Sequence, residues 1–386
     1  MIAAGLTLAT VAISVLAGSA ELALRSTNKA VDYDCRNADG YRTDRSDWQS
    51  AHFDEWREAQ LSFQWEPFSY WRSMPREGAF INVDAYGIRR TPQNPSVGRP
   101  RALLFGGSTM WGAGVRDEGT IPAHLVALSA ERFGCNLDVT NCGQIGYVAT
   151  QNLIALMRRL QSGDVPDVVV FYDGYNDVLS AMMNGRAGLA FHEAHRGVEF
   201  NILHRTRDLA SAAIRSLRLH AVLTKKGKLR PRDAGDTMGL AVDIADRYLA
   251  TAAIIRSLAK SFGFTMRCYW QPTIFRKLSL TSYEQGQKEK ISESERLFEF
   301  VEGRIAARIA QDALDDVVLL NNIFHDETRP VFIDWAHLTE SANRQVAEAI
   351  LIDLARSPIF HPTERVAPPA RRARSYGTFE PEGATA

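Results

Sequence analysis

Four short segments of the sequence carry side chains that together supply the chemistry of a nucleophilic active site. They are Gly106-Gly107-Ser108-Thr109, Asn141-Cys142-Gly143-Gln144-Ile145-Gly146, Gly174-Tyr175-Asn176-Asp177 and Asp334-Trp335-Ala336-His337. A serine hydroxyl becomes a good nucleophile when an imidazole takes its proton and a carboxylate holds that imidazole in the required tautomer. Ser108, His337 and Asp334 supply these three groups. The sequence therefore predicts attack by Ser108 on a carbonyl carbon, with His337 as the base and Asp334 as its orienting partner.

The same segments offer donors for the negative charge that develops on the carbonyl oxygen. We expect an oxyanion hole built from the backbone N–H groups of Ser108 and Gly146 and the side-chain amide of Asn176. A glycine at 146 lets the backbone approach the substrate closely. Each residue alone has a structural alternative, because Ser108 or Asp334 can cap a helix and Asn176 is a common turn residue. The joint occurrence of all of them favours catalysis.

Strands and helices alternate from Arg101 onward, which is typical of a parallel sheet covered by helices on both faces. Short apolar runs predict strands at 102–105, 137–141, 167–172, 264–271 and 316–320. Helical spacing predicts helices at 121–133, 148–160, 240–262, 285–313 and 339–355, the last capped by Thr339 with Glu340 in its first turn. The predicted fold class is α/β. Since each of the four segments follows a strand, we expect them to meet at one edge of the sheet, where ligands bind in such folds.

Composition and motifs exclude several other classes of protein. The 386 residues hold 45 Lys+Arg and 45 Asp+Glu, so no nucleic-acid partner is expected. The sequence has no Gly-x-Gly-x-x-Gly, no Walker lysine and no Cys-x-x-Cys, and we expect no cofactor and no metal. His192-Glu193-Ala194-His195 is one residue short of a zincin motif and is interpreted as a surface segment. Cys135 and Cys142 lie at the two ends of a predicted strand, too far apart to pair, and all four cysteines are interpreted as structural.

The N-terminus contains a run without charge from Ile2 to Ala20. It is about long enough to cross a bilayer, so residues 1–25 are predicted to be a membrane anchor formed by a hydrophobic helix. A cleaved signal peptide ending near Gly18-Ser19-Ala20 is the rival interpretation, and a buried helix is the third. Arg25 and Lys29 weakly favour a cytoplasmic domain. We nevertheless expect the domain on the outer face of the cytoplasmic membrane, in the cell envelope.

The rest of the chain divides into three predicted regions. Residues 26–99 form an extension packed on the core, irregular over 26–60 and rich in aromatic residues and proline over 63–75. For these aromatic residues core packing is favoured, and a platform on which sugar rings stack is the alternative. Residues 100–356 form the main domain, with an insertion near 180–240 that carries four histidines near the mouth of the site. Residues 357–386 are predicted to be a disordered tail.

The four segments resemble the blocks of the SGNH (GDSL-type) hydrolase family. In this resemblance Ser108 takes the nucleophile's place, Gly146 and Asn176 match the oxyanion-hole residues, and Asp334-Trp335-Ala336-His337 matches the final Asp-x-x-His; Gly143 is a competing match for Gly146. Gly107 replaces the aspartate of the family's first block, and residues 60–90 and 180–240 match nothing in the minimal family. The resemblance implies a three-layer, flavodoxin-like fold with a mostly parallel sheet. It also implies hydrolysis of esters through an acyl-serine, without a metal.

Three functions are consistent with these features. The first is a serine esterase that hydrolyses acyl esters, with acetyl expected, on a small molecule or an envelope glycan. The second is an O-acyltransferase that passes the acyl group to a polysaccharide hydroxyl. The third is a glycan-binding protein that keeps the fold without catalysis, and the presence of Ser108, Asp334 and His337 argues against it.

Overall fold

The computed structural model describes residues 38–42, 48–93, 100–204 and 234–356. The described residues all belong to one compact unit. The predicted membrane anchor and the predicted disordered tail lie outside the described residues. Within the described ranges, no helix is both long and apolar enough to cross a membrane.

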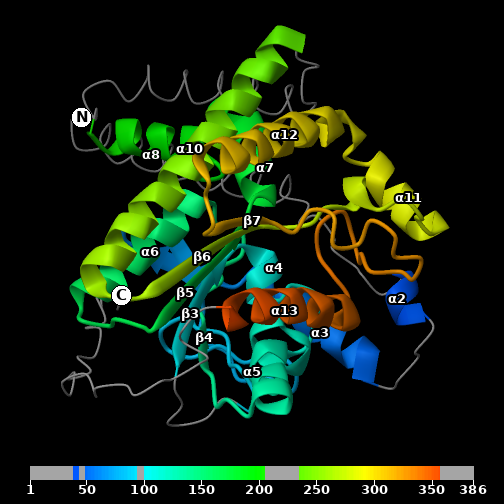
Figure 1. Ribbon diagram of the computed structural model, residues 1–386. Coiled ribbons are helices and arrows are strands. Elements are labelled where there is room, and N and C mark those ends of the chain that lie inside the picture. Colours follow the sequence, from blue (N-terminus) through cyan, green and yellow to red (C-terminus); the bar gives the residue numbers. More distant parts are fainter. Residues whose placement is uncertain (1–37, 43–47, 94–99, 205–233, 357–386) are drawn as a thin grey trace, which may run out of the picture. The chain divides into compact units, whose positions relative to one another are not determined.

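A parallel sheet lies at the centre of the described part of the chain (Figure 1). Its five strands are β3 (Arg101–Gly106), β4 (Asp138–Asn141), β5 (Val168–Asp173), β6 (Thr265–Trp270) and β7 (Val317–Leu319). They are ordered β4-β3-β5-β6-β7, and every neighbouring pair is parallel. In this order β3, the first strand of this sheet along the chain, lies between β4 and β5, which is the flavodoxin-like arrangement. The predicted α/β fold with a flavodoxin-like parallel sheet is confirmed.

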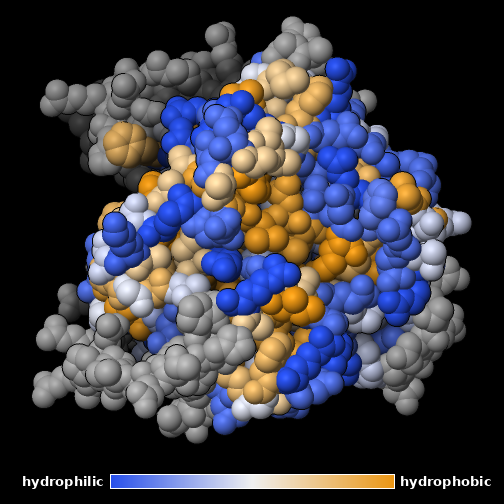
Figure 2. Space-filling model, viewed as in Figure 1, coloured by the Kyte–Doolittle hydropathy of each residue, from blue (hydrophilic) through white to orange (hydrophobic). Residues whose placement is uncertain are grey.

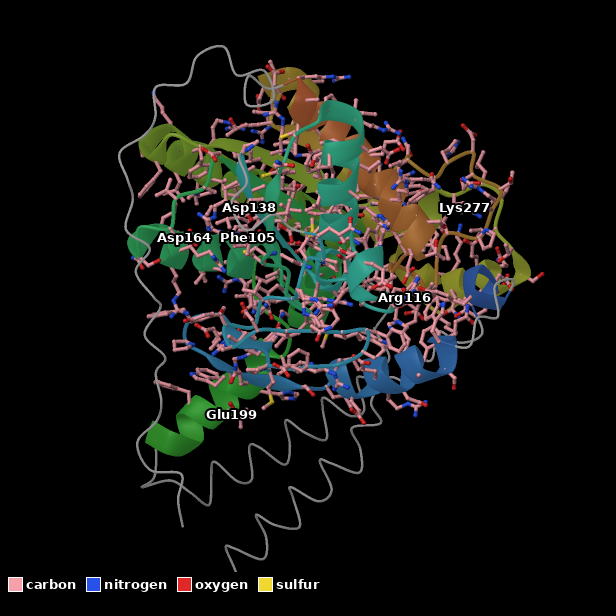
Figure 3. All side chains as sticks on the ribbon, turned by 90° about the horizontal axis from the view of Figure 1, so that it is seen from below. Phe105, Arg116, Asp138, Asp164, Glu199 and Lys277 are labelled. Atoms are coloured by element: carbon pink, nitrogen blue, oxygen red, sulfur yellow. The ribbon has the colours of Figure 1, made fainter. Side chains whose placement is uncertain are left out.

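The central strands are buried on both faces because their sequences are apolar without alternation. All six residues of β5, Val-Val-Val-Phe-Tyr-Asp, are buried, as expected for a parallel strand covered by helices on both sides. Phe105 of β3 lies opposite Phe171 of β5, and their rings stack with centroids 5.2 Å apart. Figure 3 shows Phe105 among the interior side chains. The two strands that carry the first and third segments are therefore fixed in register by the core.

Helices cover the sheet on two sides and complete three layers (Figure 1). One layer contains α5 (Ile121–Phe133) and α13 (Glu340–Ala355), and the other contains α6 (Ala149–Gln161), α7 (Tyr175–Asn184), α10 (Ala234–Phe262) and α12 (Glu295–Asp312). Short elements complete the domain: α4 (Ser108–Trp111), η2 (Asp117–Gly119), α8 (Glu193–His204), η4 (Ile274–Arg276), α11 (Ser282–Glu289) and η5 (Ser292–Ser294). Thr339 caps α13 by accepting from the Ala342 N–H at 3.3 Å, as predicted. Figure 2 shows hydrophilic residues around a central apolar area on the face seen in Figure 1.

The predicted single helix over 285–313 is wrong, because two helices occupy this range. Thr281 and Glu284 form a capping box that starts α11 at Ser282, before the predicted beginning. The chain then leaves α11 after Glu289 and enters α12 at Glu295. Glu284 is buried and paired with Lys277, so α11 is tied to the preceding loop and does not continue into α12.

The prediction of an irregular segment over 26–60 is wrong for its last part. Trp48–Ala59 forms helix α3, which buries His52, Phe53, Trp56 and Ala59. This spacing places the four side chains on one helical face. That face packs in a second apolar cluster with residues from distant parts of the chain, including Ile81 and Trp111. A short helix, α2 (Asp39–Arg42), contributes Tyr41 to the same cluster.

Arg89 connects the N-terminal extension to the loop behind the predicted nucleophile. Its side chain is 0% exposed and pairs with Asp117, Nε to Oδ1, at 3.0 Å. It also donates to the carbonyls of Trp111, Gly112 and Val115 at 3.2, 2.5 and 2.7 Å. A buried arginine is tolerated only when its charge and donors are satisfied in this way. The extension therefore shapes the segment that follows Ser108.

The aromatic stretch forms an antiparallel hairpin of β1 (Phe63–Glu66) and β2 (Tyr70–Ser73). Core packing, the favoured interpretation, is wrong for Trp65 and Phe68, which are 67% and 75% exposed. Trp71 is partly buried. The hairpin thus has one part that packs on the domain and one part that faces solvent.

The cysteines agree with their structural interpretation where they are described. Cys142 and Cys268 are buried free thiols, and burial raises the pKa of both. Cys135 is partly buried against the same core. Cys35 lies outside the described residues, as does much of the predicted insertion, residues 205–233.

Candidate active site

The four predicted segments converge at the carboxyl edge of the sheet. Ser108 begins α4 directly after β3, and Gly146 lies on the loop after β4. Asn176 is in the first turn of α7, after β5, so it belongs to a helix and not to an isolated turn. Asp334 and His337 lie on the loop between β7 and α13. The topology alone brings them together, since the carboxyl ends of parallel strands share one edge.

Ser108, His337 and Asp334 form one hydrogen-bonded line. Ser108 Oγ is 2.7 Å from His337 Nε2, and His337 Nδ1 is 2.6 Å from Asp334 Oδ2. A carboxylate only accepts, so Nδ1 carries the proton and Nε2 of the neutral ring accepts from the Ser108 hydroxyl. This is the tautomer in which an imidazole removes a proton from serine.

Asp334 is buried, yet it is held in its ionised form. Burial acts to raise the pKa of this carboxyl, but attraction to the positive charge of a protonated His337 and the hydrogen bonds that the carboxylate accepts outweigh burial, and the pKa lies below its usual value. Oδ1 accepts from the backbone N–H groups of Ala336 at 2.8 Å and His337 at 2.7 Å. The short Asp-x-x-His spacing therefore lets one loop supply the carboxylate, its hydrogen bonds and the imidazole.

Helix α11 holds this loop through residues that the sequence analysis did not single out. Glu284 Oε1 accepts from the N–H groups of Val331 and Phe332 at 3.0 and 3.1 Å, and Glu284 Oε2 pairs with the buried Lys277 at 2.7 Å. Tyr283 donates its hydroxyl to the Ile333 carbonyl at 2.8 Å. These bonds fix the backbone just before Asp334. Thr281 and Glu284 in capping-box spacing were the available signal for this helix.

The backbone distinguishes the two glycines that compete for the second block. The Gly143 N–H donates to Asn141 Oδ1 at 3.0 Å, and a Cβ on Gly143 would lie 2.5 Å from the Trp111 nitrogen. Gly143 is therefore needed for the close approach of the Trp111 backbone, and its N–H is not free to bind an oxyanion. Gly146 has φ +78°, and its N–H has no acceptor among the described residues. Ser108 is the first residue of α4, so its N–H has no acceptor within the helix.

Asn176 points its amide at the backbone between these two donors. Its Nδ2 donates one hydrogen to the Tyr147 carbonyl at 2.8 Å, which leaves the second hydrogen available. A Cβ on Gly107 would lie 2.4 Å from this Nδ2. The absence of a side chain at 107 thus makes room for the Asn176 amide beside Ser108.

No family model matches this chain, and no curated protein matches it. Solved structures do match. An acetyl xylan esterase, AlAXEase, is 16% identical with a TM-score of 0.37 over 65% of this chain and 97% of its own. The acetylxylan esterase Axe2 from Geobacillus stearothermophilus is 14% identical with a TM-score of 0.36 over 67% and 94%. A G-D-S-L family lipolytic protein from Veillonella parvula is 13% identical with a TM-score of 0.38 over 67% and 99%.

The sheet order and the placement of the four segments establish the fold. It is the three-layer, flavodoxin-like fold that the resemblance to the SGNH/GDSL-type hydrolases implies.

The end of the third segment stabilises the backbone around Asn176. Asp177 accepts from the N–H groups of Ala149 at 3.0 Å and Gly174 at 3.2 Å, which ties the starts of α6 and α7 together. Burial raises the pKa of Asp177 to about 6 and that of the neighbouring Asp173 well above its usual value. Gly174 has φ +128° and lies against the Trp270 ring, a position that a side chain could not occupy. These groups position Asn176.

Two aromatic rings border the predicted oxyanion hole, and neither was predicted there. A Cβ on Gly146 would lie 3.4 Å from Trp71 Cζ2 and 3.9 Å from Phe191 Cδ2. Trp71 is fixed in place by its Nε1–H, which donates to the Ile145 carbonyl at 2.8 Å. Tyr147 also donates its hydroxyl to the Trp71 carbonyl. The hairpin and the segment before α8 therefore reach the site from distant parts of the sequence.

The zincin-like segment does not form a metal site in the part of the chain that is described. The His192 and His195 rings stack on each other with centroids 5.4 Å apart, and Glu193 accepts from the Tyr70 hydroxyl at 3.2 Å. Among the described residues, no group of three or more His, Cys, Asp or Glu side chains is placed to hold a metal ion. Of the other two histidines of the insertion, the His204 side chain and the whole of His220 lie outside what is described.

Proposed function

We propose that this protein is a serine esterase of the SGNH type that works through an acyl-serine intermediate. The observation that carries the proposal is the continuous line from Ser108 Oγ through His337 to Asp334, with distances of 2.7 and 2.6 Å. Nucleophile, base and orienting carboxylate are within hydrogen-bonding reach of each other, which is the geometry that general-base activation of serine needs.

In the first half of the reaction, Ser108 Oγ attacks the ester carbonyl carbon while its proton moves to His337 Nε2. The carbonyl oxygen becomes an oxyanion, which accepts hydrogen bonds from the Ser108 and Gly146 N–H groups and the Asn176 amide. When the tetrahedral intermediate collapses, the carbon–oxygen bond to the alcohol breaks. The alcohol leaves with the proton from His337, and the acyl group remains on Ser108.

In the second half, a water molecule takes the place of the alcohol. His337 removes one proton from the water as its oxygen attacks the acyl carbon, and the same oxyanion hole receives the negative charge. The bond to Ser108 Oγ then breaks, the serine regains its proton from His337, and the carboxylic acid leaves. The ionised Asp334 stabilises the imidazolium in both halves.

We propose an acetyl or similarly small acyl group. Trp71 and Phe191 crowd the space beside Gly146, so a group bound in the oxyanion hole has aromatic walls close to it. The expectation is a steep fall of kcat/KM from p-nitrophenyl acetate to longer p-nitrophenyl esters. A rate that rises with acyl length would contradict this choice.

Hydrolysis of p-nitrophenyl acetate by the purified full chain tests the proposal. Ser108→Ala and His337→Ala should each reduce kcat by about a thousandfold or more, because the three groups act as a unit. Ser257→Ala, at an exposed position on α10, is the matched control and should leave the rate unchanged. Activity that survives Ser108→Ala would sink the assignment. Measuring acetate release with and without a glycan acceptor distinguishes hydrolysis from acyl transfer.

We also propose that the domain works in the cell envelope, attached to the outer face of the cytoplasmic membrane. The support is the uncharged run over 2–20, which is outside the described residues. A reporter enzyme that is active only after export, fused to the C-terminus, should be active. An inactive reporter with an intact fusion would place the domain in the cytoplasm.

A further inference from the structure

The β1–β2 hairpin carries tryptophans both beside the oxyanion hole and out in solvent. Trp65 and Trp71 are directly opposite each other in the antiparallel pair, so their side chains stand on the same face of the ribbon. Trp71 borders Gly146, as described above, and Trp65 is 67% exposed. An aromatic strip therefore runs from the proposed reaction centre to the surface.

The insertion adds a second wall to this strip. The Arg196 guanidinium of α8 lies 4.0 Å from the Tyr70 ring centroid and 5.1 Å from that of Trp71. Arg196 also donates to the Phe191 carbonyl at 2.5 Å, and the Tyr70 hydroxyl donates to Glu193. Figure 3 shows α8, labelled at Glu199, beside the blue hairpin. The stacked guanidinium thus fixes the ring positions on both sides of the strip.

The hairpin is held rigidly on α6, as a binding platform needs to be. Gln151 donates to the Ser69 carbonyl at 2.7 Å, and Arg158 donates to the Pro67 carbonyl at 3.3 Å and pairs with Glu66. Phe68 and Tyr70 have φ of +69° and +78°, which are costly for aromatic residues. Backbone held in such conformations clusters at sites that bind ligands.

We propose that this strip is a binding platform for the sugar chain of an acylated oligosaccharide, with Trp65 stacking on a sugar ring one or more units away from the ester. The inference rests on the proposed esterase function and names the alcohol part of its substrate. A flat ring face with solvent-exposed edges suits a pyranose, whose apolar face stacks while its hydroxyls stay hydrated. The charged pairs of Glu66 with Arg72 and Arg158 border the strip and offer partners for sugar hydroxyls. A lipid surface would instead have to desolvate these charges.

Chain-length dependence of the full chain's activity tests the platform. The substrates are p-nitrophenyl acetate and acetylated monosaccharides and tetrasaccharides of β-1,4-linked glucose, xylose and N-acetylglucosamine. For the backbone it accepts, the wild type should hydrolyse the tetrasaccharide with higher kcat/KM than the monosaccharide. Trp65→Ala should lower kcat/KM on the tetrasaccharide by about tenfold, equivalent to about 1.4 kcal/mol. It should leave p-nitrophenyl acetate and the monosaccharide unchanged, and Trp65→Tyr should keep most of the chain-length effect.

Phe262→Ala is the matched control, because Phe262 is an exposed aromatic residue at the end of α10, just before β6 and thus at the opposite edge of the sheet. It should change no rate. Equal rates on every tetrasaccharide and its monosaccharide, or an equal loss on all substrates in Trp65→Ala, would overturn the platform. p-Nitrophenyl octanoate is assayed beside these substrates, and a loss confined to it in Trp65→Ala would also overturn the platform, because Trp65 would then contact the acyl chain. If Ser108→Ala retains activity, the proposed function fails first; if Ser108 is essential and chain length has no effect, only the platform fails.

Discussion

Replacing Gly107 by alanine tests the proposed oxyanion hole without touching any group that reacts. Gly107 has φ −81° and ψ −155°, an extended conformation that alanine adopts without strain. The new Cβ would lie 2.4 Å from Asn176 Nδ2, whereas ordinary contacts begin near 3.4 Å, so the amide has to move by about 1 Å. A donor must lie within about 2.7–3.1 Å of the oxyanion to stabilise it. The expected loss is that of one oxyanion-hole donor, about 100- to 1,000-fold in kcat or about 2.7–4 kcal/mol.

The fold should survive this substitution, because Asn176 Nδ2 is the end of a side chain that can turn away. The assay is kcat and KM on p-nitrophenyl acetate, together with thermal unfolding of the same samples. Gly303→Ala is the control, since a Cβ there meets open space on α12. It should leave kcat unchanged and stabilise the helix by up to about 1 kcal/mol.

A double-mutant cycle with Asn176→Ala identifies the mechanism of the loss. If alanine at 107 acts by displacing the Asn176 amide, the double variant should be little worse than Asn176→Ala alone. Losses that add in full would show that the two positions act separately. A Gly107→Ala enzyme whose kcat stays within about threefold of wild type, about 0.7 kcal/mol, would refute the role of the amide.

Three further predictions follow from the buried ionisable groups. Asp334→Asn should lower kcat by about ten-thousandfold, because an amide at this position favours the wrong tautomer of His337. Steady-state kinetics measure this loss, and an unchanged thermal unfolding curve shows that the fold is intact. A loss of kcat below about tenfold would contradict the prediction. Burial lowers the pKa of His52 from 6.5 to about 4, so the unfolded chain binds the proton more readily and stability is lost as pH falls from 6.5 to 4. Between pH 6.5 and pH 4, the free energy of unfolding of the wild type, measured with urea, should fall by roughly 3 kcal/mol more than that of His52→Gln. Plots of unfolding free energy against pH that run parallel for the two proteins would disprove this. Glu284→Gln leaves the buried Lys277 without its counter-charge and should lower the unfolding free energy by about 3–5 kcal/mol. Adding Lys277→Met to this variant should restore part of the lost stability. If the double variant recovers none of it, the ion pair between Glu284 and Lys277 is not the cause of the loss.

The sheet and the reacting groups could be predicted because their signals are local. Runs such as Val168–Asp173, rich in β-branched and aromatic residues, favour strands buried on both faces, and their alternation with helices favours a parallel sheet. The carboxyl ends of those strands then have to meet. Ser108, Asp334 and His337 could therefore be assigned to one place before any distance was known.

The surroundings of the site depend on contacts between distant segments, which leave little trace in the sequence. Trp71 bonds to Ile145 across 74 positions, and nothing in the aromatic stretch indicates which of its rings turns inward. Helix α3 was missed because its sequence is polar on average, although His52 and Trp56 have helical spacing. Helix α11 has no continuous apolar face, and its capping box was the better signal.

Trapping the acyl group on Ser108 tests the central claim most directly. Mixing the enzyme with p-nitrophenyl acetate should release a burst of p-nitrophenol equal to the enzyme concentration if hydrolysis of the acyl-serine is the slow step. Rapid quenching in acid followed by mass analysis of peptides should then find one acetyl group on the peptide that contains Ser108. We expect that label at Ser108 in the wild type and no acetylated peptide at this position in Ser108→Ala. An acetyl group on another residue of the wild type, or wild-type turnover with no acylated peptide, would contradict the acyl-serine mechanism.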